Sequence, residues 1–293
     1  MSLHVDRYET AGSGAPLLLI HGWGMHGGMW EDAAKKLAQH YRVMAVDLPG
    51  HGLSRTMKGE EPVSAFSLDF IVDRLSDQFD GPLTVCGWSL GGQVALRWAL
   101  RHPQQVERLV LVASTPCFVR LDGWEHALSV EILEEFAANL QQDYAQTLRR
   151  FLSLQMRGSE QERAVLALLR ESLFSRGTPD LYALEAGLDI LRDSDQRGAL
   201  PEVTQPTLVL AGGRDTLIPR QAAQYLAGQI PDARLAMIEG AAHAPFLSHP
   251  DAFMERVLEF MHDGNSNPPR SPLVRGEATS SPDKGRLGGV GVA

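Results

Sequence analysis

A serine between two glycines is the strongest chemical signal in this chain. Residues 87–91 read Gly-Trp-Ser-Leu-Gly, after an apolar run at 83–86 and before a stretch with helical spacing. In a strand-to-helix turn, a Gly-x-Ser-x-Gly exposes the serine hydroxyl for attack on a carbonyl carbon. Glycine suits this turn because it tolerates strained backbone angles and close packing. The same pattern occurs in ordinary loops, so its place between a strand and a helix carries the prediction that Ser89 is the nucleophile of an ester hydrolase.

A serine hydroxyl at neutral pH needs a base, and the base needs a carboxylate that orients it. Asp215 lies just after an apolar run at 207–211, and His243 lies in a loop of small residues after the run at 234–238. The order serine, acid, histidine is the one used by hydrolases built on a parallel α/β sheet. We therefore predict a catalytic triad of Ser89, Asp215 and His243.

Both partners of the serine have structural alternatives. Asp215 could serve only to cap a helix that begins near Pro219. Weaker candidates for the acid and the base are Asp189, Glu239 and His249. The last of these stands at an ordinary helix entrance, so His243 is the preferred base.

The tetrahedral intermediate of ester hydrolysis needs two N–H donors aimed at its oxyanion. We expect one from the backbone amide of Leu90, the residue after the nucleophile, and the other from the amide of Trp23 in the loop after the first central strand. For the side chains of Trp23 and Trp88, packing in the core is the alternative to a role in the site.

The same loop contains a second motif, which favours a different class of enzyme. Gly22, Gly24 and Gly27 form a Gly-x-Gly-x-x-Gly after a strand, and Asp47 ends the next strand about twenty residues on, as in dinucleotide-binding folds. An NAD(P)-dependent oxidoreductase is therefore an alternative. Two bulky residues crowd the turn, however, and the Leu-Pro-Gly-His-Gly-Leu-Ser that follows Asp47 is typical of hydrolases. A third possibility is a non-catalytic protein with a hydrolase fold, but such proteins usually lack a triad member and none is missing here.

Short apolar runs alternate with amphipathic stretches along most of the chain. The expected strands are 16–20, 42–46, 83–86, 109–113, 207–211 and 234–238, and the expected helices between them include 30–39, 68–79 and 93–101. This alternation predicts an α/β fold, with a mostly parallel central sheet and helices on both faces. In such sheets, ligands bind beyond the carboxyl ends of the strands, which is where the candidate residues fall.

The strand signal stops between 118 and 198, where four amphipathic helices are expected at 130–140, 144–154, 160–173 and 181–191. We interpret 118–198 as a helical lid inserted into a core domain formed by 1–117 and 199–261. Residues 262–293 are rich in Ser, Pro and Gly and hold few large apolar side chains, so we expect a disordered tail.

Composition narrows the partners and the location. The chain has 293 residues, of which 44% are hydrophobic, and a net charge of −9, which argues against binding of nucleic acid. It holds only two cysteines, Cys86 and Cys117, and neither a signal peptide nor a run long enough to span a bilayer. We expect a soluble, cytoplasmic monomer with no membrane partner, no cofactor and no metal site, since metal-ligand motifs are absent from the sequence.

Taken together, these motifs resemble the α/β-hydrolase superfamily and, more narrowly, the pimeloyl-[acyl-carrier-protein] methyl ester esterases of biotin synthesis. The resemblance runs from about residue 20 to 250, and its segments around Cys117, Phe151 and His243 are the most specific. The matching segments are His-Gly-Trp-Gly at 21–24, Asp-Leu-Pro-Gly at 47–50, Gly-Trp-Ser-Leu-Gly-Gly at 87–92, Ser-Thr-Pro-Cys-Phe at 114–118, Arg-Phe-Leu-Ser-Leu-Gln at 150–155, Gly-Leu-Asp-Ile-Leu at 187–191 and Ala-Ala-His-Ala-Pro-Phe-Leu-Ser-His-Pro at 241–250.

The resemblance implies hydrolysis of the methyl ester of pimeloyl-acyl-carrier protein to the free pimeloyl carrier and methanol. Promiscuous hydrolysis of short acyl esters is the alternative within the same class. The positions that match substrate contacts of the family are Trp23, Ser89, Leu90, Phe151, Leu152, Ser153, Leu154, Gln155 and His243.

A cluster of arginines in the expected lid supports a carrier partner independently of the resemblance. Between 149 and 176 the acidic chain holds six arginines against three glutamates, Glu160, Glu162 and Glu171. An acidic carrier protein would be steered to such a face. The alternative is a solvated helix face on which arginines pair with these glutamates. Our docking candidates are Arg149, Arg150, Arg157 and Arg163, and the remaining two arginines are Arg170 and Arg176.

Overall fold

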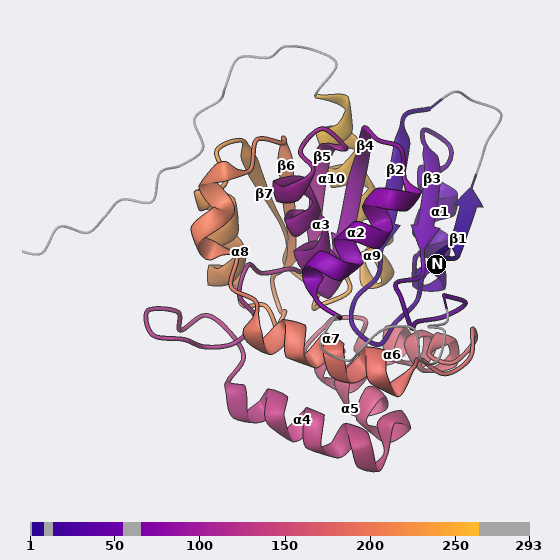
Figure 1. Cartoon of the computed structure of the whole chain (residues 1–293), viewed down its shortest axis with the longest axis vertical. Helices are drawn as coiled ribbons and strands as arrows, with labels where there is room; N and C mark the ends of the chain where they lie inside the picture. The colour runs from indigo at the N-terminus through magenta and orange to yellow at the C-terminus, as the bar shows by residue number, and fades with distance from the viewer. Residues whose placement is uncertain (1, 9–13, 55–65, 264–293) are drawn as a thin grey trace, which may run out of the picture.

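The computed structural model describes residues 2–8, 14–54 and 66–263. These residues form one seven-stranded sheet in the order β1-β3-β2-β4-β5-β6-β7, in which only β1 runs antiparallel to its neighbour. The strands are β1 (Val5–Tyr8), β2 (Pro16–Ile20), β3 (Arg42–Val46), β4 (Leu83–Trp88), β5 (Val106–Val112), β6 (Thr207–Gly212) and β7 (Ala233–Ile238). Figure 1 shows the sheet between layers of helices, so the predicted α/β fold is confirmed.

The central strands are buried along their whole length because both faces of the sheet are covered. Every residue of β4 and β6 is buried, as expected for parallel strands under helices on both sides. Helices α2 (Leu68–Gln78) and α3 (Leu90–Arg101) pack together, and α1 (Glu31–Leu37) packs with α10 (Pro250–His262) on the other face. Helix α8 (Arg220–Gln229) packs on β6 and β7.

Two features of the sheet domain differ from the sequence expectations. Strand β1 was not predicted, because its four residues are mostly polar and only partly buried at the sheet edge. Helix α3 begins at Leu90, three residues before the expected start, because Gly91 and Gly92 belong to its first turn and not to the preceding loop.

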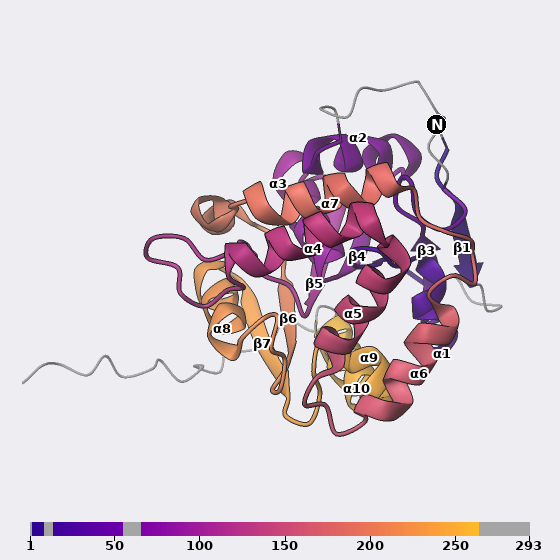
Figure 2. The ribbon, with the colours of Figure 1, turned by 90° about the horizontal axis from the view of Figure 1, so that it is seen from below.

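Four α-helices lie between β5 and β6 in the sequence, and we call them the insert helices. They are α4 (Val130–Gln142), α5 (Tyr144–Met156), α6 (Glu162–Ser172) and α7 (Leu181–Asp193). Strands β5 and β6 are neighbours in the sheet, so the chain leaves the sheet and returns beside its point of departure. Figures 1 and 2 show the insert helices lying across the edge of the sheet at which the parallel strands end.

The remaining elements are short or lie near the end of the described chain. They are the 3-10 helices η1 (Gly27–Trp30) and η3 (Arg197–Glu202) and the helix α9 (Pro245–Ser248). Helix α10 includes His262, the first residue of the expected tail, and 264–293 lie outside the described residues. None of the described helices combines the length and the apolar character needed to cross a membrane.

Candidate active site

Ser89 sits on the turn between β4 and α3 with a backbone conformation that few residues other than glycine adopt. Its φ is 55°, and such a strained angle persists only where the surroundings hold it. The Ser89 amide donates to the Val112 carbonyl (2.9 Å), and the Ser114 hydroxyl donates to the Ser89 carbonyl (2.9 Å). The end of β5 and the residues that follow it therefore hold the turn in place.

The glycines around Ser89 allow neighbouring chains to approach it closely. A Cβ at Gly91 would lie 2.5 Å from the carbonyl oxygen of Ile20 in β2, and one at Gly87 would collide with the Gly91 backbone. A Cβ at Gly22 would lie 3.2 Å from the Ser89 Cβ. The loop after β2 consequently lies directly against the serine.

His243 and Asp215 form a buried pair on the loops that follow β7 and β6. The two atoms His243 Nδ1 and Asp215 Oδ2 lie 2.8 Å apart, with 0% and 1% of the side chains exposed. The other carboxylate oxygen, Oδ1, accepts the amides of Leu217 (2.9 Å) and Ile218 (3.0 Å). Helix α8 begins only at Arg220 and receives no side-chain cap, so the helix-cap alternative for Asp215 does not apply.

This pairing decides which nitrogen of His243 can act as a base. Because Nδ1 donates its proton to Asp215, the neutral ring has its lone pair on Nε2. Among the described residues, the buried Nε2 has no hydrogen-bond partner. It is therefore available to accept a proton from a hydroxyl or from water.

Backbone contacts on both sides hold the loop of His243. Its amide donates to the Gln155 carbonyl at the end of α5 (3.2 Å), and its carbonyl accepts the indole N–H of Trp88 (2.8 Å). Trp88 precedes the serine, so it connects the turn of Ser89 to the loop of His243. The only sequence signal for this role is that Trp88 adjoins Ser89.

The weaker candidates for acid and base are occupied elsewhere. Asp189 and Glu239 are more than half exposed and pair with Arg192 and Arg220 respectively. His249 is the residue before α10 and faces Glu160 at 3.7 Å.

Residues 21–28 run from the end of β2 into η1 and include Trp23, the expected second oxyanion donor, so we call them the oxyanion loop. Among the described residues, neither the Trp23 amide nor the Leu90 amide donates a hydrogen bond, and the latter opens α3. His21 braces the loop, since its Nε2 accepts the Leu48 amide (3.0 Å) and its Nδ1 donates to the Gly22 carbonyl (2.8 Å). Burial, with His51 nearby, lowers the pKa of His21 to about 3, so the ring is neutral.

The glycine pattern of this loop does not form a dinucleotide site. Asp47 is fully buried. Its oxygens accept the amides of Gly27 (2.5 Å) and Leu53 (2.9 Å) and contact Arg176, which leaves no oxygen directed at a ribose. At Gly24, where a pyrophosphate would need room, a Cβ would lie 2.5 Å from a methyl carbon of Leu148 in α5. The structure therefore does not favour the oxidoreductase alternative.

The residues of α5 that match substrate contacts in the family, 151–155, divide into a buried group and a partly buried group. Phe151, Leu152 and Gln155 are buried, and Phe151 packs edge-on against Trp23 with ring centroids 4.9 Å apart. Among the described residues the side-chain oxygen of Gln155 has no partner. Ser153 and Leu154 are only partly buried and face away toward a different space.

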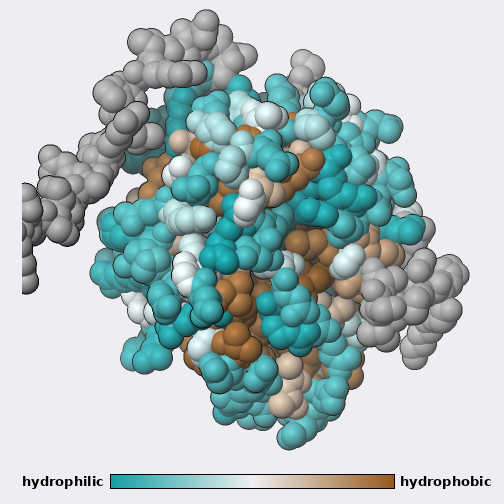
Figure 3. Space-filling view, turned by 60° about the vertical axis from the view of Figure 1, so that its left-hand side comes forward, coloured by the Kyte–Doolittle hydropathy of each residue, from teal (hydrophilic) through white to brown (hydrophobic). Residues whose placement is uncertain are grey.

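That space is a cavity of about 380 Å³ between α4 and α5. Its lining residues are Ile132, Glu135, Phe136, Asn139, Thr147, Arg150, Ser153, Leu154 and Arg157. Phe136 packs edge-on against Phe151 with centroids 5.6 Å apart, so aromatic rings connect this cavity with Trp23. Figure 3 shows apolar side chains gathered at the level where the insert helices meet the sheet domain, among hydrophilic ones.

The four arginines expected to dock a carrier are all exposed on the insert helices and their connections. None of these four forms an ion pair with any residue that the structure describes. Of the glutamates expected to pair with them, Glu160 binds Arg214 (2.9 Å) and Glu162 accepts the Gly158 amide (3.0 Å). The Arg149 guanidinium lies over the ring of Phe174.

Arg176 does not belong to this positive face, although the sequence count included it. Its side chain is only 17% exposed, and it pairs with Asp6 (2.5 Å) and with Asp47 (3.3 Å). The sequence shows that charge gathers in this segment but not which way each side chain points.

The chain matches known proteins over most of its length. Residues 15–250 match the family described as alpha/beta hydrolase fold. The chain is 46% identical over 253 residues to the pimeloyl-[acyl-carrier protein] methyl ester esterase of Nitrosomonas europaea, which covers 86% of this chain and 97% of that protein. It is 42% identical to the protein of the same name in Nitrosospira multiformis, over 89% of this chain and 98% of that protein.

Solved structures of lower sequence identity share the fold. An esterase from Exiguobacterium antarcticum superposes with a TM-score of 0.76 at 22% identity, over 89% of this chain and 95% of that one. A hydrolase from Oleispira antarctica gives a TM-score of 0.78 at 18% identity, over 88% and 94%.

Proposed function

Because the chain belongs to the α/β-hydrolase fold family, we propose that it is a serine carboxylesterase that hydrolyses the methyl ester of pimeloyl-[acyl-carrier protein] in biotin biosynthesis. The observation that carries this proposal is the buried pair of His243 and Asp215 (2.8 Å) beside the strained turn of Ser89. Relatives named for this reaction are 38–46% identical over 86–89% of the chain.

In the first half of the reaction, His243 Nε2 accepts the hydroxyl proton of Ser89 while Oγ bonds to the ester carbonyl carbon. The carbonyl oxygen becomes an oxyanion held by the amides of Leu90 and Trp23. Asp215 stabilises the imidazolium that forms. When the tetrahedral intermediate collapses, the bond to the methoxy oxygen breaks and His243 gives its proton to that oxygen, so methanol leaves.

The second half returns the enzyme to its starting state. Water attacks the carbonyl carbon of the acyl-enzyme, and Nε2 of His243 takes one of its protons. The same two amides hold the second oxyanion. Collapse breaks the bond to Ser89, Oγ regains the proton from His243, and the free carboxylic acid departs on its carrier.

We further propose that 118–198 form a lid, inserted into a core domain of 1–117 and 199–261, whose arginines bind the carrier protein. Four exposed guanidiniums without an ion pair among the described residues support this. Arg150 and Arg157 flank the cavity whose lining includes Ile132, Phe136 and Leu154. Positive charge around an apolar groove suits an aliphatic arm on an acidic protein. We also propose that the enzyme acts as a cytoplasmic monomer, with both cysteines free and buried.

Methanol release from methyl-pimeloyl carrier protein tests this function against general esterase activity. We expect kcat/KM for the carrier-linked ester to exceed that for short acyl esters such as p-nitrophenyl butyrate, and the Ser89→Ala variant to be inactive on both. Growth of a biotin auxotroph that lacks this step should be restored by the wild type but not by Ser89→Ala. Equal kcat/KM for both ester classes, without growth rescue, would favour the promiscuous carboxylesterase.

A further inference from the structure

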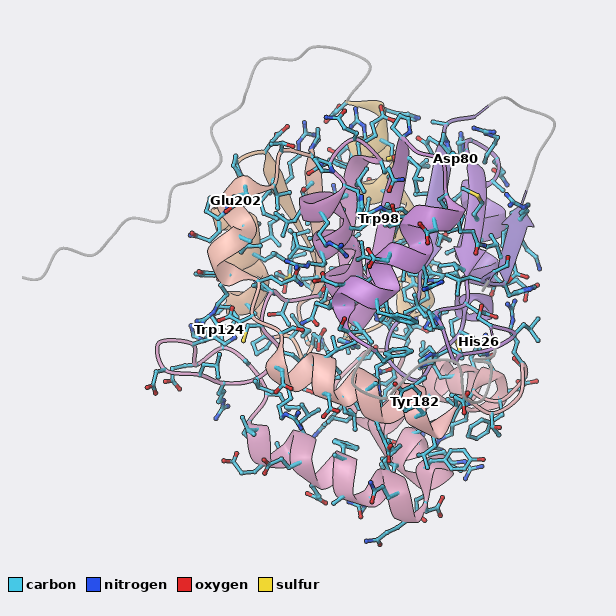
Figure 4. The ribbon with its side chains drawn as sticks, in the orientation of Figure 1. His26, Asp80, Trp98, Trp124, Tyr182 and Glu202 are labelled. Carbon is cyan, nitrogen blue, oxygen red and sulfur yellow. The ribbon has the colours of Figure 1, made fainter. Side chains whose placement is uncertain are left out.

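The segment 172–187, which we call the strap, leads from the end of α6 into α7. It contacts the oxyanion loop directly at two places and, at a third, contacts Asp47, which accepts an amide of that loop. Figure 4 labels His26 of the oxyanion loop and Tyr182 of the strap, both at the level where the sheet domain meets the insert helices. The contacts join residues 129 to 161 positions apart in the sequence. The direct contacts hold Trp23 and His26, and the indirect one acts on Gly27.

The first contact holds the indole of Trp23. Its Nε1 donates to the Leu184 carbonyl in α7 (2.9 Å), and the side chain is 1% exposed. One turn further on, a Cβ at Gly187 would lie 2.6 Å from Cδ1 of this indole and 2.9 Å from its Nε1. Gly187 does not have a positive φ, so the indole, and not the backbone conformation, excludes a side chain here.

The second contact holds His26. Its Nδ1 accepts the Gly28 amide (3.1 Å), so its Nε2 carries the proton and donates to the Ser172 carbonyl (2.8 Å). Burial lowers the pKa of His26, which keeps the ring neutral and this donor arrangement fixed.

The third contact reaches the loop through a carboxylate. Arg176 Nη1 lies 3.3 Å from Asp47 Oδ2 and 3.4 Å from Oδ1, and Oδ1 accepts the Gly27 amide (2.5 Å). The other guanidinium nitrogen, Nη2, binds Asp6 (2.5 Å). Arg176 thus connects the strap, the end of β3 and the oxyanion loop.

We propose that the strap sets the position of the oxyanion loop, with Gly187 and Arg176 as positioning residues for the amide of Trp23. This rests on the proposed role of that amide as an oxyanion donor. Hydrogen bonds weaken steeply as the donor turns away from the acceptor, and a displacement of about 1 Å near the reacting atoms can cost about 100-fold in rate. A change in the strap therefore lowers kcat although no strap residue touches the reacting atoms.

Gly187→Ala separates this positioning from stability. Alanine favours a helix over glycine, yet here its methyl group must push the Trp23 indole aside. We expect kcat for p-nitrophenyl butyrate to fall about 10- to 100-fold, with KM changed less than about twofold. The matched control is Gly228→Ala in α8, where nothing lies within 4 Å of the added methyl group, and it should keep the wild-type kcat.

Binding of a trifluoromethyl ketone, which forms a tetrahedral oxyanion with the serine, gives the readout that a purely structural role would not change. Its Ki should rise in Gly187→Ala by the same factor as kcat/KM falls, whatever the change in melting temperature. Arg176→Gln should behave likewise and Arg176→Lys should recover part of the loss. Arg192→Gln, which removes an exposed arginine of α7, is the control for charge.

Wild-type kcat and Ki in Gly187→Ala would overturn the positioning role of the strap, and so would a loss that appears only in KM. Neither result bears on the esterase assignment. That assignment fails only if the Ser89→Ala variant keeps the esterase activity of the wild type. The two proposals therefore fail on different variants.

Discussion

The carboxylate of Asp215 uses its two oxygens for two tasks. One oxygen accepts two amides of its own loop, and the other holds Nδ1 of His243. The loop thus fixes the direction of the carboxylate, and the carboxylate fixes the tautomer of the histidine. Removing the charge while keeping the shape separates these tasks.

Asp215→Asn should lower kcat for a short acyl ester by about 10³- to 10⁴-fold. The amide oxygen can still accept the loop amides, but the amide N–H₂ turned to His243 forces the ring proton onto Nε2, where it can no longer accept a proton from Ser89. Stopped-flow or steady-state hydrolysis measures the change. Asp189→Asn, at the exposed rival position, should leave kcat unaltered, and a loss below tenfold in Asp215→Asn would contradict the assigned acid.

At the scale of single residues, the sequence predicts which residue types act in the site and their order along the chain. It does not predict which groups surround each side chain. Loops after parallel strands meet at one edge, so Asp215 and His243 could be expected close together, and the structure brings them within 2.8 Å. The role of Asp47 could not be foreseen. In the sequence it completes a dinucleotide motif, and only its burial among the amides of Gly27 and Leu53 reveals a brace for the loop.

Among the elements, α5 presents two different faces to two different partners. Its buried residues Phe151 and Gln155 lie toward the sheet domain, whereas Arg150 and Leu154 line the outer cavity. Under the proposed docking, one helix would therefore contact both the reacting end of the substrate and the carrier that delivers it.

Charge reversal at two of the docking candidates, Arg150 in α5 and Arg163 in α6, tests the docking role. Arg150→Glu with Arg163→Glu should lower kcat/KM for the carrier-linked ester about tenfold or more while sparing p-nitrophenyl butyrate, because attraction to an acidic partner raises the association rate. The difference should shrink as salt is added. Arg192→Glu on α7 controls for net charge. If both substrates lose equally, the arginines do not dock the carrier.

The elements themselves were largely predictable, and the exceptions have physical reasons. Periodic apolar residues predicted the insert helices. Strand β1 was not predicted, because a short edge strand needs no apolar face. The start of α3 was placed late because glycines usually mark loops. Here Gly91 serves close packing against Ile20 inside a helix, which no propensity scale includes.

Across the whole molecule, the candidate site is assembled from the ends of four strands and covered by one insertion. The pattern of strands and helices predicted the fold, because parallel strands must be buried on both faces. The contacts of the strap were beyond prediction, since Trp23 and Leu184 are 161 positions apart. Contacts between residues so far apart depend on how the insert helices pack on the sheet domain, and no local sequence pattern encodes that packing.

Three buried histidines, two in the oxyanion loop and the third, His51, beside His21, predict how stability depends on pH. Burial lowers the pKa of His21 to about 3 and also lowers those of His26 and His51. Unfolded histidines titrate near 6.5, so below that pH the unfolded chain binds more protons than the folded one. The stabilisation is complete above pH 6.5 and is lost as the pH falls toward the folded pKa values.

The free energy of unfolding should therefore decrease below pH 6.5 by up to about 1.4 kcal/mol per pH unit for each histidine that stays neutral. Urea denaturation between pH 7.5 and 5 measures this slope. His51→Asn cannot protonate, so its slope should be smaller than that of the wild type whatever its absolute stability. Parallel curves for the two proteins would show that His51 does not take part.

Helix α10, the last helix among the described residues, offers a place to attach the enzyme away from its candidate site. Figure 1 shows α10 ending at the side of the sheet opposite the insert helices, and its final residue is His262. A dye, a biosensor surface or a fused protein attached just after this helix would leave the arginine face and the cavity between α4 and α5 open. The enzyme could therefore be tethered at this point in single-molecule or surface-based measurements of carrier binding, with the proposed docking surface facing the solution.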